Sequence, residues 1–179
     1  MNFSLTPFSL KDSPQVTISG TVKQQNNNIS ISYIVAGNIE EIYFPPALAN
    51  PTRKDDLWKT TCFEFFIAAK DSPGYWEFNL SPSGEWNVYI MDAYRQVNMR
   101  EETRVTKLEI RVQKEEKCFV LEHELNLDSI MLEETSAQVG IASVIAANTG
   151  QLSYWALTHP HAEADFHLRN SFVLEFPAS

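Results

Sequence analysis

Apolar and polar residues alternate along most of the chain, and this period-two pattern predicts β-strands. The alternating runs occupy residues 15–24, 28–37, 40–44, 60–69, 75–81, 85–91, 107–113, 118–125, 138–147, 152–157 and 172–176. Turn-forming segments such as QNNN, KDSPG, SPSG and NTGQ separate them. A helical start is visible only at residues 127–134, which allow a turn or two. The pattern predicts an all-β fold, an antiparallel β-sandwich of the immunoglobulin-like jelly-roll type with little helix.

The stretch YWEFNLSPSGEWNVY, from Tyr75 to Tyr89, reads as two strands around a tight loop. One alternating set is apolar and comprises Trp76, Phe78, Leu80, Trp86 and Val88. The other set comprises Tyr75, Glu77, Asn79, Asn87 and Tyr89. A face that only meets solvent more often holds Lys, Thr and Ser, so a carboxylate, amides and phenols together on one face require an explanation.

Side chains on one face of a hairpin pair with those of the neighbouring strand, which allows a register to be assigned. Placing Phe66 opposite Tyr75 sets Glu64 opposite Glu77, and placing Leu80 opposite Trp86 sets Glu77 beside Tyr89. The opposite face is then the predicted core, with Phe63, Phe65, Trp76, Phe78, Leu80, Trp86, Val88 and Ile90. A slip of two residues would keep these faces and change the partners.

Two carboxylates that face each other require a cation, a shared proton or a ligand. Arg53, in the irregular stretch from Pro45 to Lys59, and Arg95 are the candidate cations, and an arginine bridging the two glutamates is the purely structural interpretation. The functional interpretation is that carboxylates and amides bind a polar ligand beside an aromatic platform from Trp58, Tyr89 or Tyr94. Sugar recognition uses this mixture, because hydroxyls need donors and acceptors while the ring packs on an aromatic.

Length and net charge limit the number of domains and the classes of partner that this protein can bind. The 179 residues contain no linker-like segment, so we expect one domain spanning 1–179. A net charge of -9 disfavours nucleic acid and anionic membranes as partners, because both bind clustered cations.

The first residues lack a signal-peptide pattern and no apolar run approaches a membrane span, so a cytoplasmic location is expected. Cys62 and Cys118 lie in strand-like runs and are expected to be free thiols.

Four blocks of the sequence, RKDDLWKTTCFEFFI, YWEFNLSPSGEWNVYIMDAYR, YWALTHP and ADFH, resemble the DOMON-like domains. These are relatives of the family-nine carbohydrate-binding modules, and the likeness is greatest to a group of small stand-alone bacterial members. The resemblance implies an antiparallel β-sandwich that binds sugars in some branches and haem in others. It implies ligand-binding roles for Trp58 and Glu64, with Trp155 as a second aromatic wall.

The segment HPHAEADFH brings His159, His161, Asp165 and His167 close together in sequence, a composition that can bind zinc. Its spacing matches no standard metal motif, so a metal ion is not favoured. We expect Asp165 and His167 to form a hydrogen-bonded pair at the edge of the site, and His161 to face solvent.

Haem is a second cofactor that is not favoured. Axial ligation would need His123, Met91 or Met99 at the pocket, and none of them stands in a haem-attachment motif. A carboxylate- or metal-dependent hydrolase acting on sugars is the enzymatic alternative, because Glu64 and Glu77 could approach the separation that a retaining glycosidase requires.

The sequence thus predicts non-catalytic binding of a small polar ligand, with a carbohydrate as the preferred class. A protein partner that pairs with a sheet edge is a further alternative. The residues predicted to bind the ligand are Arg53, Trp58, Glu64, Glu77, Asn79, Tyr89, Tyr94, Arg95, Trp155, His159, Asp165 and His167.

Overall fold

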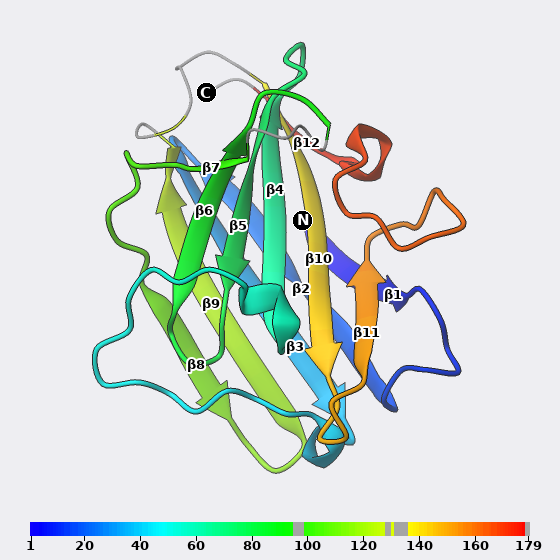
Figure 1. Cartoon of the computed structure of the whole chain (residues 1–179). Helices are drawn as coiled ribbons and strands as arrows, with labels where there is room; N and C mark the ends of the chain where they lie inside the picture. Colours follow the sequence, from blue (N-terminus) through cyan, green and yellow to red (C-terminus); the bar gives the residue numbers. More distant parts are fainter. Residues whose placement is uncertain (95–98, 128–129, 131–135, 178–179) are drawn as a thin grey trace.

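The computed structural model describes residues 1–94, 99–127, 130 and 136–177, which form a β-sandwich (Figure 1). Its strands are β1 (Asn2–Pro7), β2 (Val16–Gln25), β3 (Asn28–Gly37), β4 (Cys62–Ala69), β5 (Tyr75–Leu80), β6 (Trp86–Met91), β7 (Arg100–Glu101), β8 (Ile110–Lys114), β9 (Cys118–Asn126), β10 (Ala137–Ala146), β11 (Leu152–Ala156) and β12 (Leu174–Phe176). The 3-10 turns are η1 (Ile39–Glu41), η2 (Leu57–Lys59) and η4 (Arg169–Ser171). The predicted all-β class is confirmed. No helix in the described part of the chain has the length and apolar character needed to cross a membrane.

The strands form two antiparallel layers. The front sheet, nearest the viewer in Figure 1, has the order β7-β6-β5-β4-β10-β11, and β12 pairs with the beginning of β10. The back sheet has the order β1-β2-β3-β9-β8. Strand β1 joins the two layers, because Asn2–Leu5 pair with β2 while Thr6 and Pro7 pair with β11.

The core lies between the two sheets and contains the face that the alternation predicts. Phe65 stacks on Phe78 with ring centroids 4.3 Å apart, and Phe63 stacks on Phe119 of the back sheet at 5.7 Å. Full burial of each such ring stabilises the fold by roughly 1.5–3 kcal/mol. The predicted core residues Phe63, Phe65, Phe78, Leu80, Trp86 and Val88 are all buried, whereas Trp76 and Ile90 are half-buried.

The register of the two central hairpins is confirmed in one case and corrected in the other. Glu77 pairs with Tyr89 in the β5–β6 hairpin as predicted. In the β4–β5 hairpin, however, Glu64 pairs with Asn79 and Phe66 with Glu77, a slip of two residues from the predicted register. The last pair of this hairpin is Ile67 with Trp76, and in the connection the backbone N–H of Ser72 donates to the carbonyl of Ala69. The faces are unchanged, and the two glutamates lie diagonally on neighbouring strands.

One expected strand is absent from the described structure, and not every observed strand was expected. Residues 40–44 contain the end of η1 and a single bridge from Ile42 to Ala147 in place of a strand, while β1 is a strand that the alternation did not identify. The expected helical start at 127–134 falls largely outside the described residues.

The outer face of the front sheet is partly covered by the turn η2 and by residues 157–173, here called the C-terminal segment. Phe172 of this segment packs on Phe66 and Tyr75, with ring centroids 5.5 Å and 5.7 Å away. Gly140 of β10 permits this approach, because a Cβ atom there would lie 2.8 Å from the Phe172 ring. The outer face is therefore a second layer of packed side chains around a hollow.

Candidate functional site

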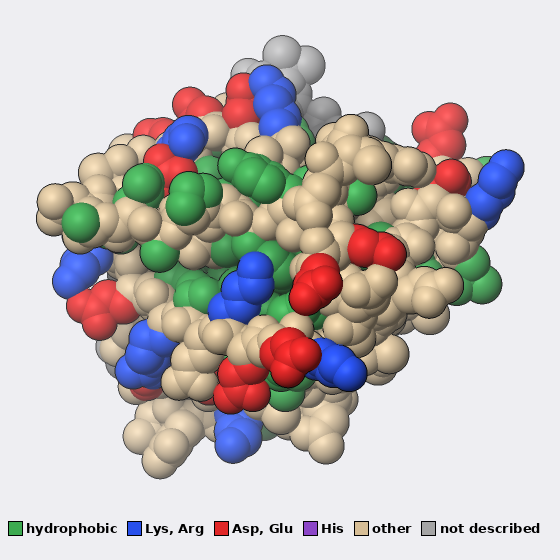
Figure 2. All heavy atoms as spheres, turned by 90° about the horizontal axis from the view of Figure 1, so that it is seen from below, with side chains coloured by type: hydrophobic (Ala, Val, Ile, Leu, Met, Phe, Trp, Pro, Cys, Tyr) green, Lys and Arg blue, Asp and Glu red, His purple; other side chains and the backbone are tan. Residues whose placement is uncertain are grey.

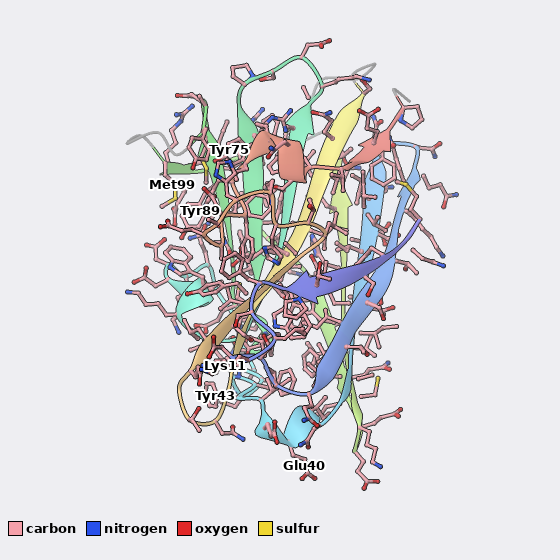
Figure 3. All side chains as sticks on the ribbon, turned by 90° about the vertical axis from the view of Figure 1, so that its right-hand side faces the viewer. Lys11, Glu40, Tyr43, Tyr75, Tyr89 and Met99 are labelled. Atoms are coloured by element: carbon pink, nitrogen blue, oxygen red, sulfur yellow. The ribbon has the colours of Figure 1, made fainter. Side chains whose placement is uncertain are left out.

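A cavity of about 240 Å³ opens on the outer face of the front sheet, between η2 and the C-terminal segment. It is lined by Trp58, Glu64, Glu77, Met99, Val144, Tyr154, Ala164, Phe166 and His167. In Figure 3, Tyr75 and Tyr89 lie on this side of the sheet, with Met99 further out. The lining combines aromatic side chains with two carboxylates, and it contains Trp58, Glu64, Glu77 and His167 from the predicted set.

The two glutamates form the floor of the cavity. Glu64 on β4 is 4% exposed and Glu77 on β5 is 5% exposed. The side-chain N–H of Asn79 donates to Oε1 of Glu77 at 2.8 Å, and the Cys62 thiol donates to Oδ1 of Asn79 at 3.5 Å. Asn79 is itself fully buried, so it orients Glu77 from beneath. Within the described residues, Oε2 of Glu77 has no hydrogen-bond partner.

Burial controls the charge of this pair. Desolvation, followed by the charge of Glu77, raises the pKa of Glu64 well above its usual range. Desolvation also raises the pKa of Glu77 to about 7, against the opposing hydrogen bond from Asn79. His167 lies nearby, with Nδ1 3.9 Å from Oε2 of Glu77, but this nitrogen hydrogen-bonds the Tyr75 hydroxyl at 3.0 Å. The floor therefore favours either a shared proton or a ligand that donates to the carboxylates.

Aromatic side chains form the walls. The ring of Trp58, on η2, meets the Tyr89 ring edge to face with centroids 6.1 Å apart. The Tyr89 hydroxyl donates to Oδ1 of Asp55 at 2.6 Å, which fixes the ring beneath Trp58. On the other side, Tyr154 of β11 and Phe166 of the C-terminal segment meet at 6.2 Å. Tyr89 thus supports one wall, and the surfaces that reach the cavity belong to Trp58, Tyr154 and Phe166.

Arg53 does not bridge the two glutamates, which corrects one structural interpretation of the pair. Its guanidinium lies 4.4 Å from the centroid of the Trp86 ring and donates to Oδ1 of Asn87 at 2.7 Å. It also donates to the backbone carbonyls of Glu102 and Val105. These acceptors hold Arg53 beside β6, which is separated from β4 and Glu64 by the whole of β5. The other candidate cation, Arg95, lies outside the described residues.

Trp155 is not a wall of the cavity, contrary to the expectation from the resemblance. It is 3% exposed in the core between the sheets, where its indole N–H donates to Oγ of Ser153 at 3.0 Å. Because alternate residues of a strand point to opposite faces, the neighbouring Tyr154 faces the cavity instead.

The remaining predicted residues lie at or beyond the rim. The Tyr94 hydroxyl donates to Oδ2 of Asp165 at 2.6 Å, and Oδ1 of Asp165 accepts from the backbone N–H of His167 at 3.0 Å. Asp165 therefore fixes the loop that carries His167, as expected. His159 hydrogen-bonds the carbonyl of Thr6 at 2.9 Å and does not line the cavity. His161 is exposed, as predicted.

The cofactor candidates occupy different environments. Across the described residues, no group of three or more His, Cys, Asp and Glu side chains is arranged to hold a metal ion. His123 is buried in the core, with Nδ1 3.0 Å from the Glu109 carbonyl. Met91 is buried beneath the outer face, and only Met99 of the three haem-ligand candidates reaches the cavity.

Sequence reasoning missed Met99, Val144, Tyr154, Ala164 and Phe166 as lining residues. Alternation on β10 and β11 contained the signal for Val144 and Tyr154, because each of them lies between two neighbours in its strand that point to the other face. For Phe166 and Ala164, in an irregular segment, periodicity gives no such signal.

A second hollow of about 340 Å³ lies at the lower end of the sandwich, beside Tyr43, Pro46, Leu48 and the β5–β6 turn. Figure 2 views this end and shows hydrophobic side chains gathered among acidic and basic ones. Its polar groups are largely satisfied by one another, since Oγ of Ser83 donates to Oγ of Ser81 at 2.8 Å and Lys54 pairs with Glu85 at 3.0 Å. It is the weaker candidate for a ligand site.

Comparison with known proteins finds solved structures with a similar fold. No family model and no curated protein sequence matches the chain. A solved structure from Bacteroides uniformis ATCC 8492, provisionally described as a carbohydrate-binding protein, superposes with a TM-score of 0.71 at 10% identity over 96% of this chain and 83% of that one.

Two structures of a family-nine carbohydrate-binding module from Caldicellulosiruptor kristjanssonii are also similar. The complex with glucose gives a TM-score of 0.55 at 8% identity over 84% of this chain and 71% of that one. The complex with cellotriose gives 0.54 at 10% identity over 84% and 69%. The chain therefore has a β-sandwich fold like that of the family-nine modules, while the DOMON-like assignment stays a prediction.

Proposed function

We propose that this protein binds a saccharide in the cavity on the front sheet without converting it. The likeness of its fold to modules solved with glucose and with cellotriose supports this class of ligand. The volume of about 240 Å³ is below the ~300 Å³ at which drug-sized pockets begin, so it suits a single sugar ring with any further units in solvent.

One observation carries the proposal: three aromatic walls enclose two buried carboxylates in the same cavity. The C–H face of a sugar ring packs on an aromatic ring, while its hydroxyls donate to carboxylate oxygens. In this arrangement Trp58 and Phe166 supply the apolar contact, and Glu64 and Glu77 accept hydrogen bonds. Asn79 and Tyr89 hold those groups in place from below, and His167 stands at the edge.

Isothermal titration calorimetry with glucose, cellobiose and cellotriose, after a glycan-array screen, tests the proposal. The Trp58→Ala variant should weaken binding at least ~10-fold, because one aromatic platform is lost. Tyr43→Ala is the matched control, since Tyr43 is an exposed aromatic residue that lines the second hollow and not this cavity, and a loss of affinity in this variant alone would place the sugar in the second hollow. A folded protein that binds no saccharide in either assay, or equal affinity for both variants, would contradict the proposal.

A hydrolase acting on sugars is the second candidate, because the pKa of Glu77, raised to about 7, suits a general acid. Turnover of chromogenic glycosides by the wild type, lost in Glu77→Gln and retained in Tyr43→Ala, would favour the enzyme. Saturable binding without turnover favours the module.

A further inference from the structure

The floor of the cavity is acidic. Glu64 and Glu77 approach it from neighbouring strands, and both are more than nine-tenths buried. In the described part of the chain, no lysine or arginine lines the cavity or forms an ion pair with either glutamate. Oε2 of Glu77 is buried at the cavity floor, and no hydrogen bond from the described residues satisfies it. The described residues thus leave Oε2 of Glu77 able to accept a hydrogen bond from a bound ligand.

Among the described residues, the groups that face the pair are two neutral acids and one histidine. Cys62 of β4 is a neutral acid whose pKa is raised by burial and further by the charges of the two glutamates. Tyr89 of β6 is also a neutral acid, and its pKa is raised by burial, then by its hydrogen bond to Asp55 and the charge of that residue, and then by the charge of Glu77. His167 directs Nδ1 to the Tyr75 hydroxyl at 3.0 Å and lies 3.9 Å from Glu77. The described surroundings are therefore neutral or acidic, apart from any charge on His167.

We propose that the saccharide bound in this cavity carries an unacetylated amine, so that the ligand class is a cationic amino sugar. The inference rests on the proposed function and specifies it. An ammonium group supplies three donors and a positive charge together, whereas a neutral hydroxyl supplies one donor and no charge. Two carboxylates from neighbouring strands can accept such donors while both are ionised.

The walls suit the same ligand. Trp58, Tyr154 and Phe166 present aromatic surfaces to the cavity beside the two carboxylates. Aromatic faces attract cations within about 6 Å of the ring centroid and also pack against the C–H groups of a sugar ring. A bare divalent ion would not use these walls and would need about six oxygen ligands. The net charge of -9 adds a general attraction for cationic ligands.

The test compares three pairs of sugars by calorimetry at about pH 7, where an amine of this type is largely protonated. Glucosamine, galactosamine and mannosamine are titrated against glucose, galactose and mannose, and N-acetylglucosamine serves as an uncharged ligand of similar bulk. At least one amino sugar should bind ~10-fold or more tightly than both its parent and its acetylated form.

The Glu77→Gln variant keeps the shape of the floor and removes one charge, so the preference for the amine should fall to within about 3-fold. Glu109→Gln is the control for net charge, because Glu109 is exposed, pairs with Lys107 in the segment before β8 and does not line the cavity. It should retain the full preference.

The outcomes separate this inference from the proposed function. Equal or weaker binding of every amino sugar relative to its parent would overturn the inference and leave saccharide binding standing. The inference is equally overturned if Glu77→Gln, confirmed to be folded by thermal unfolding, keeps the full preference. Absence of binding to any sugar in these titrations and in the glycan array would overturn both.

Discussion

Replacing Glu77 with glutamine should stabilise the protein, and the gain should grow as the pH rises. Burial raises the pKa of Glu77 from its ordinary 4.5 to about 7, which means that the folded state holds its proton more tightly than the unfolded state. Stability therefore falls as the pH rises through this interval. A pKa difference of about 2.5 corresponds to about 3 kcal/mol once the pH exceeds about 7. Glutamine avoids this cost and can still accept the hydrogen bond from Asn79.

Urea and thermal unfolding of both proteins at several pH values measure this effect. The difference in unfolding free energy should be close to zero at about pH 4 and should reach about 3 kcal/mol at about pH 8. For a chain of this size the latter corresponds to about 6–12 °C in Tm. The neighbouring Glu64 contributes in the same direction, because the charge of Glu77 is one cause of its raised pKa.

The matched control is Glu175→Gln. Glu175 is exposed, and its hydrogen bonds from Gln138 and Lys70 lower its pKa, so this variant should show no stabilisation that grows with pH. If Glu77→Gln differs from the wild type by the same amount at every pH, or is less stable at about pH 8, the glutamate does not bear a desolvation cost and the argument fails.

Three further changes test the packing and the corrected role of Arg53. Phe78→Ala should cost about 3–5 kcal/mol in urea unfolding, because the side chain is 0% exposed in the core, and a near-neutral result would reverse the assignment of the faces. Arg53→Lys should lower the free energy of unfolding by about 2 kcal/mol, because stacking on Trp86 and several hydrogen bonds are lost. Its saccharide affinity should not change, and a large loss of affinity would show that Arg53 contacts the ligand. Gly140→Ala should cost about 1–3 kcal/mol and speed proteolysis of the C-terminal segment, because its Cβ would displace Phe172; equal rates would show that the segment does not depend on this contact.

The floor of the site could be predicted from the sequence because it depends on a local rule. Successive residues of a strand point to opposite faces, so once the apolar positions of β4 and β5 are turned to the core, Glu64, Glu77 and Asn79 share the outer face. A register slip of two residues does not change a face, which is why the correction to the β4–β5 hairpin moved partners and left the pair together.

Two of the three aromatic walls, Trp58 and Phe166, depend on contacts that no local period encodes. Trp58 comes from a 3-10 turn preceding β4. Phe166 comes from an irregular segment that follows β11, more than 100 residues later in the sequence. Their approach is set by tertiary contacts such as the Phe172 ring over Gly140. Trp155 is an example of the opposite error. The resemblance assigned this tryptophan to the ligand site, whereas its position in the alternation of β11 places it in the core.

This division between floor and walls has a physical consequence for how such a site can change. The floor residues are strand positions whose backbones are held by ladder hydrogen bonds on both sides, as β4 lies between β5 and β10. Wall residues such as Phe166 sit on loops, where substitution disturbs few backbone hydrogen bonds and costs little stability. Substitutions in the walls should therefore alter which sugar ring fits, whereas the positions of the two carboxyl groups in the floor are fixed by the strand pairing.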